Sequence, residues 1–150
     1  VPLLVANRDV ELTINSFKAL PNAVLFATGS CWEGIDFTGD VVSSLIIVTL
    51  PFSVPDEIKR QEQRRYPCLR DYIESTVVPA MQQKLKQGFG RAFRSETDTC
   101  VVSILDPRAL HGARYHRHAL AALPDCPLTH QLQDVAEFIV RVKDPGYFVI

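Results

Sequence analysis

Short apolar runs alternate with segments in which apolar residues recur at helical spacing. Three of these runs, 23–27, 44–50 and 100–105, are rich in β-branched and aromatic residues and are apolar at successive positions. This pattern predicts strands of a parallel sheet that is covered on both faces. Leu3–Val5 predicts a fourth, shorter strand.

Helical spacing appears between and after these strands. Residues 9–20 place Val10, Ile14 and Phe17 on one face, and residues 119–123 and 132–142 predict two later helices, which Pro124 and Pro127 separate. Strands that alternate with helices predict an α/β fold with helices on both faces of the sheet. Polar and turn residues follow each strand, at the edge where such sheets bind ligands.

The 150 residues are enough for one domain with a sizeable core, because 47% of them are apolar. The formal net charge of −1 gives no general attraction to nucleic acid, so any such contact requires a local patch. No stretch reaches the ~18 apolar residues of a membrane span.

A further helix is predicted from Pro79, a residue suited to the first helical position, to about Arg94. One of its faces is an apolar stripe that would pack on the sheet, formed by Met81, Leu85, Phe89 and Ala92. The opposite face carries one amide and two guanidinium groups, those of Gln87, Arg91 and Arg94.

Two glycines, Gly88 and Gly90, flank this polar face. Each costs up to ~1 kcal/mol of helix stability relative to alanine. The pair therefore indicates either a close approach to the backbone or an early end of the helix. A solvated charged face with incidental glycines is the simpler alternative.

The segment Gln87-Gly-Phe-Gly-Arg-Ala-Phe-Arg94 matches the QxxGRxxR pattern of motif VI in superfamily 2 helicases. Upstream, Thr28-Gly-Ser-Cys-Trp-Glu-Gly-Ile-Asp-Phe37 resembles motif V of the DinG/XPD branch. Leu50-Pro-Phe52 and Leu105-Asp-Pro-Arg108 complete the order of that branch. The resemblance covers about residues 1–125, and Trp32 with the 86–91 block favours the bacterial DinG side.

The resemblance implies a RecA-like (P-loop NTPase-like) domain, the second and C-terminal one of an ATP-dependent DNA helicase motor. In that family ATP and Mg²⁺ lie between two such domains, and the first domain supplies the phosphate loop. The sequence contains neither GxxxxGK[ST] nor Asp-Glu-x-His, so residues 1–150 are expected to be an N-terminally truncated fragment without ATPase activity of its own. Any iron–sulfur cluster would belong to the missing part, and the implied location is cytoplasmic.

The resemblance also implies residue roles. The catalytic positions would be two arginine fingers that meet the γ-phosphate and an amide that orients water: Arg91, Arg94 and Gln87. The nucleotide side of motif V would be lined by Gly34, Asp36 and Glu33. Single-stranded DNA would contact Thr28, Gly29, Ser30 and Trp32. The packing of Trp32 under its own loop is the alternative for that residue, and a carboxylate at a helix start is the alternative for Glu33.

Two basic clusters have two interpretations each. The run Lys59, Arg60, Arg64 and Arg65 is either a solvated helix face or a DNA-backbone patch, and Arg108, Arg114 and Arg117 are either a basic rim or part of a surface helix. The four histidines fit no common zinc spacing, so no metal site is predicted. A helicase linked to an exonuclease domain is a rival within the branch. A non-catalytic nucleotide- or protein-binding α/β module is the rival from another class.

Overall fold

The computed structural model describes residues 1–6, 9–20, 22–28, 37, 41–92 and 98–148. Four short strands, β1 (Leu3–Val5), β2 (Val24–Phe26), β3 (Ser44–Ile47) and β4 (Val101–Ile104), lie where the apolar runs predicted them. Each of the three longer runs forms a shorter strand than predicted. The described helices are α1 (Val10–Ala19), α2 (Glu57–Gln63), α3 (Leu69–Tyr72), α4 (Val78–Ala92), α5 (His116–Ala121) and α6 (Leu132–Val142).

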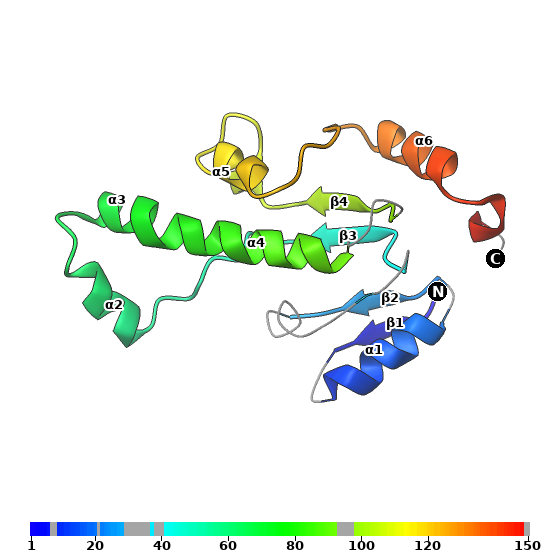
Figure 1. Ribbon diagram of the computed structural model, residues 1–150, viewed down its shortest axis with the longest axis horizontal. Coiled ribbons are helices and arrows are strands. Elements are labelled where there is room, and N and C mark those ends of the chain that lie inside the picture. Colours follow the sequence, from blue (N-terminus) through cyan, green and yellow to red (C-terminus); the bar gives the residue numbers. More distant parts are fainter. Residues whose placement is uncertain (7–8, 21, 29–36, 38–40, 93–97, 149–150) are drawn as a thin grey trace.

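The strands form two parallel pairs, β1 with β2 and β3 with β4. Leu3 lies opposite Val24 in the first pair, and Ser44 lies opposite Val101 in the second. All four arrows point the same way in Figure 1, so the carboxyl ends of the strands share one edge. The parallel α/β prediction is confirmed, but hydrogen bonds between the described strands do not join them into one continuous sheet.

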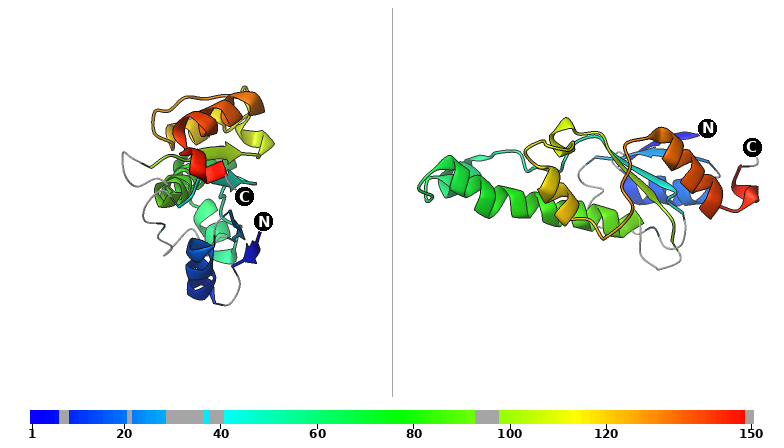
Figure 2. Two further views of the ribbon diagram at one scale, coloured as in Figure 1. Left: turned by 90° about the vertical axis from the view of Figure 1, so that its right-hand side faces the viewer. Right: turned by 90° about the horizontal axis from the view of Figure 1, so that it is seen from above.

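Helices cover only one face of these strands. Figure 2 shows α1 and α4 on the same side of the two strand pairs. On the uncovered face lie large exposed apolar side chains, those of Leu3, Val5, Val24, Phe26, Ile46 and Val48. Among the described residues helices lie on one face of the strands, so the prediction of helices on both faces stays a prediction. The apolar residues that suggested it are present, but the described residues supply no layer over the second face.

The core lies between the β3–β4 pair, α4 and α5. Met81 and Leu85 of α4 are 0% exposed and pack with Ile47 and Leu50, which belong to β3 and the chain just after it. Ala119 of α5 closes the same cluster. This packing fixes the inner face of α4, and hence the direction in which its outer face points.

The continuous helical run that contains α4 begins earlier than predicted. α3, a π-helical turn (Ile73–Val77) and α4 follow one another without a break. The Val78 N–H donates to the Ile73 carbonyl, five residues back. Pro79 is therefore inside a continuous helical run rather than at its first residue. Because proline has no N–H and its ring crowds the preceding turn, a wider π turn immediately before it accommodates the ring.

The other predicted helices are confirmed with small shifts. α1 is capped by the Asp9 carboxylate, which accepts a hydrogen bond from the Leu12 N–H at 3.1 Å. α5 begins at His116, three residues earlier than predicted, and α6 spans the predicted residues. None of the helices in the described ranges has the length and apolar character that crossing a bilayer requires.

Candidate functional site

The outward face of α4 presents Gln87 and Arg91. Gln87 is exposed, Arg91 is half-buried, and neither makes a hydrogen bond or an ion pair with another described residue. Arg94, the third residue predicted for this face, lies outside the described residues. The guanidinium of Arg91 is thus held on a helix that is anchored in the core, and its donors have no partner within the described chain.

The packed face of α4 differs from the prediction at one position. Its buried residues recur three and four apart: Val78, Met81, Leu85, Gly88 and Ala92. Phe89, which was predicted for this stripe, is only half-buried. Gly88 occupies its place because position 88 continues the spacing from Leu85 to Ala92, whereas position 89 is rotated toward the flank. The helix does not end at the glycines.

Gly90 lies on the outer side of α4. It is exposed, and a Cβ atom added to it would meet no described atom within 4 Å. Glycine in a helix interior costs stability, and nothing in the described structure requires it here. The absence of a side chain next to Arg91 would instead allow another molecule or domain to approach the helix backbone.

We expect Gly90→Ala to raise the stability of this chain by about 0.5–1 kcal/mol, because alanine restricts the unfolded chain and meets no clash. Urea unfolding followed by circular dichroism measures the change. Gly112→Ala is the matched control and should destabilise, because Gly112 has a φ of 80° that alanine adopts poorly. A destabilised Gly90→Ala variant would show that the position is constrained within this chain.

The ends of β3 and β4 are joined by Asp106, whose side chain is 2% exposed. Its Oδ2 accepts from the Leu50 backbone N–H at 2.7 Å and from Arg108 Nη2 at 2.7 Å. Its Oδ1 accepts from the Arg108 backbone N–H at 2.9 Å and from Arg108 Nε at 3.0 Å. These hydrogen bonds hold the pKa of the Asp106 carboxyl far below its ordinary value, with the Arg108 side chain as the largest cause.

Arg108 is half-exposed, and its orientation is fixed on two sides. Its Nε and Nη2 hydrogen bonds hold it to Asp106, and its guanidinium carbon lies 4.8 Å from the centre of the Phe52 ring. Phe52 packs against Tyr115 with ring centroids 4.8 Å apart, and the Arg114 guanidinium carbon lies 5.2 Å from the Tyr115 ring. We call the four residues Arg108, Phe52, Tyr115 and Arg114 the arginine–aromatic stack. The sequence pointed to Phe52 and Arg108 as parts of loop motifs and to Arg108 and Arg114 as a possible rim. Tyr115 was not singled out, and no sequence signal pairs it with Phe52.

Most of the motif V residues lie outside the described residues: Gly29, Ser30, Trp32, Glu33, Gly34 and Asp36. Thr28 is described and exposed, and it follows the carboxyl end of β2 by two residues. Phe37, at the far end of the motif, packs edge-on against Phe17 of α1, with ring centroids 5.7 Å apart. The roles predicted for the motif V residues stay predictions.

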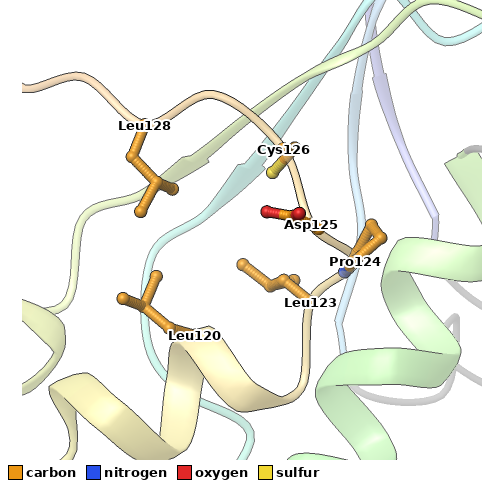
Figure 3. Close-up of a pocket in the computed structure, with 6 residues that line it drawn as sticks. All are labelled: Leu120, Leu123, Pro124, Asp125, Cys126 and Leu128. Carbon is orange, nitrogen blue, oxygen red and sulfur yellow. The ribbon is translucent and has the colours of Figure 1, made fainter.

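A pocket after α5 is distinct from these groups. Its lining comes from α5 and the loop that follows it, and consists of Leu120, Leu123, Pro124, Asp125, Cys126 and Leu128 (Figure 3). Its one charged group is a carboxylate, which repels phosphate, and it contains none of the predicted site residues. Within the described ranges, no three His, Cys, Asp or Glu side chains gather as they would around a metal ion.

Comparison with known families identifies the kind of domain. Residues 2–126 match the model of a family described as "Helicase C-terminal domain". The chain belongs to the helicase C-terminal domain family. The matched region of this helicase C-terminal domain includes all four strands, α4 and the arginine–aromatic stack, and it ends before α6.

Several bacterial proteins are similar to this helicase C-terminal domain. The chain is 35% identical to the ATP-dependent DNA helicase YoaA of Escherichia coli, over 84% of this chain and 20% of that protein. It is 38% identical to the YoaA protein of Haemophilus influenzae, over 84% and 20%. It is 31% identical to the 3'-5' exonuclease DinG of Bacillus subtilis, over 85% and 14%. The chain therefore spans a fifth or less of the length of these relatives, and the DinG-type resemblance is confirmed.

Proposed function

We propose that this chain is the second RecA-like motor domain of an ATP-dependent DNA helicase of the DinG type. The observation that carries the proposal is Arg91. It stands beside the packed face of a helix that is anchored in the core, and it has no hydrogen-bond or ion-pair partner among the described residues. Because a guanidinium on an anchored helix, without a partner among the described residues, is suited to neutralise phosphate charge, we assign Arg91 as an arginine finger. Parallel strand pairs with helices on one face agree with a RecA-like fold, and helices on the second face are part of the proposal.

The residues present fit one side of an ATP site. When ATP and Mg²⁺ bind, the metal neutralises part of the phosphate charge and the hydrolysis supplies the energy for movement. Arg91, with Arg94 beside it in sequence, would approach the γ-phosphate, and the exposed Gln87 amide would orient water or a finger. Gly34, Asp36 and Glu33 are proposed to line the nucleotide side.

The rest of the ATP site belongs to another domain. The sequence contains no phosphate loop, so a first RecA-like domain must hold most of the nucleotide. Any iron–sulfur cluster would also lie in that part of the protein. Single-stranded DNA is the proposed track, with Thr28, Gly29, Ser30 and Trp32 as contacts, and a cytoplasmic location is proposed with it. A module that did not use ATP would have no need for the unpaired Arg91, which argues against the non-catalytic alternative.

The test compares the intact protein with this chain alone. We expect the intact protein to hydrolyse ATP faster with single-stranded DNA and to unwind a duplex with a single-stranded tail. The 150-residue chain should release no phosphate from ATP above the rate in buffer, because the phosphate loop is absent. Saturable turnover by the chain alone, unchanged in an Arg91→Ala preparation, would indicate a contaminant. Turnover that disappears with Arg91→Ala would contradict the proposed division of labour.

A further inference from the structure

The segment that follows β4 is rich in basic residues and has no acidic ones. Residues 107–124 contain three arginines, three histidines and no carboxylate. Arg108, Arg114 and Arg117 are all exposed. Arg114 and Arg117 form no ion pair with another described residue. This surface is therefore a local positive patch on a chain whose net charge is close to zero.

The other basic run of the chain is partly neutralised. Lys59 lies 3.2 Å from the Asp56 carboxylate, and Arg60 lies 3.6 Å from that of Glu57. Because these pairs form within one helix turn, the run offers less free positive charge than its sequence suggests.

Two carboxylates lie close to the patch after β4, and neither forms an ion pair with Arg114 or Arg117. Both oxygens of Asp106 already accept hydrogen bonds, from Arg108 and from the Leu50 backbone N–H. Glu74, in the π-helical turn before α4, has its carboxylate 3.7 Å from the His118 ring nitrogen. Within the described residues, the charges of Arg114 and Arg117 therefore remain available to an external anion.

The arginine–aromatic stack also shapes this patch. Two guanidinium groups lie over two aromatic rings that pack on each other, at the carboxyl ends of β3 and β4. Phe52 and Tyr115 pack against the core, so the stack is held in place from below. Lys84 of α4 adds a further cation, 3.4 Å from the Ser53 hydroxyl next to Phe52. Fixed guanidinium groups bind phosphate oxygens, and their planes stack on bases.

We propose that the arginine–aromatic stack, together with Arg117, binds the backbone phosphates of single-stranded DNA. The inference rests on the proposed function and adds a contact surface that motif V does not contain. A strand is favoured over a single nucleotide because the cations come from separate elements: Lys84 from α4, Arg108 and Arg114 from the segment after β4, and Arg117 from α5. Arg114 and Arg117 supply the available charge, and Arg108, whose Nε and Nη2 are held by Asp106, has its Nη1 donors left for phosphate.

The test uses the Arg114→Ala/Arg117→Ala double variant of the intact protein and fluorescence anisotropy with a labelled oligothymidylate. Both side chains are exposed and form no hydrogen bond or ion pair with described residues, and Arg114 loses only its contact with the Tyr115 ring, so the variant should fold normally. We expect binding to weaken roughly tenfold near physiological salt, and the slope of log affinity against log salt to fall by about 1.4, because each single-strand phosphate contact contributes about 0.7. The KM for ATP should not change.

The matched control is Lys18→Ala/Arg141→Ala, which removes the same charge from α1 and α6, where both side chains are exposed. It should leave the salt slope unchanged. Equal losses in the two double variants would mean that only net charge matters and would overturn the inference, as would unaltered DNA binding or a raised KM for ATP in the Arg114→Ala/Arg117→Ala protein. Turnover at saturating DNA separates this result from the proposed function: it should persist here and be lost in Arg91→Ala.

Discussion

Replacing Arg91 by alanine should lower the ATP turnover of the intact protein by roughly 10³-fold or more, the smallest effect typical of an arginine finger. The KM for ATP should change little, because a finger acts mainly in the transition state and the first domain holds most of the nucleotide. The melting temperature should also stay nearly constant, since Arg91 forms no hydrogen bond or ion pair with the described residues. Steady-state phosphate release and thermal melting of the same preparations measure both quantities.

Three further variants make this test specific. Arg91→Lys should rescue little, because an ammonium group cannot reproduce the planar fork of a guanidinium. Gln83→Ala changes an exposed residue of the same helix and should retain normal turnover. Leu85→Ala opens a cavity in the core and should cost about 2–5 kcal/mol of stability. If Arg91→Ala unfolded the protein, or left turnover near normal, the assignment of the outward face of α4 would be wrong.

Replacing Asp106 by alanine should destabilise the chain by about 3 kcal/mol, near the lower end for breaking a buried ion pair. The buried N–H of the Leu50 peptide loses its acceptor and cannot reach water, whereas the half-exposed Arg108 side chain can be solvated again. Urea unfolding at neutral pH gives the difference. Asp56→Ala is the control: it removes an exposed carboxylate that caps α2, and should cost about 1 kcal/mol.

Acid provides an independent measurement of the same carboxylate. The folded state lowers the pKa of Asp106, so the folded protein binds the acidic proton less readily than the unfolded chain. The stabilisation is therefore present above the unfolded pKa of about 3.9, and it is lost as the pH falls from about 5 toward the lower folded value. Asp106→Asn should flatten this part of the stability curve. A variant with the same acid limb as the original chain would show that other carboxylates cause it.

Much of the fold could be predicted from local patterns. Apolar runs identified every described strand, and the three-and-four spacing of Met81, Leu85 and Ala92 identified the packed face of α4. Such patterns report which side of an element is apolar. They do not report whether another layer covers it, which is why the exposed face formed by Leu3, Val5 and their neighbours was predicted to be buried.

Longer-range contacts were beyond sequence reasoning. The π turn before Pro79 depends on how a whole helical run adapts to a missing N–H, whereas residue preference alone placed proline at a helix start. The arginine–aromatic stack joins Phe52 and Tyr115 from two strand exits, and no spacing rule relates them. Motif VI was found because its residues are close in sequence, whereas the stack only exists once the strands are paired.

The Asp106 carboxylate also has a mechanical meaning. A motor that moves along DNA must carry tension from the strand into its own body. Asp106 connects the Arg108 guanidinium to both strands. It accepts a hydrogen bond from Arg108 and one from the backbone just after β3, and it is itself the second residue after β4. A pull on Arg108 would therefore load two parallel strands at once, and the stiffness of the contact would be that of the folded sheet rather than that of a loop.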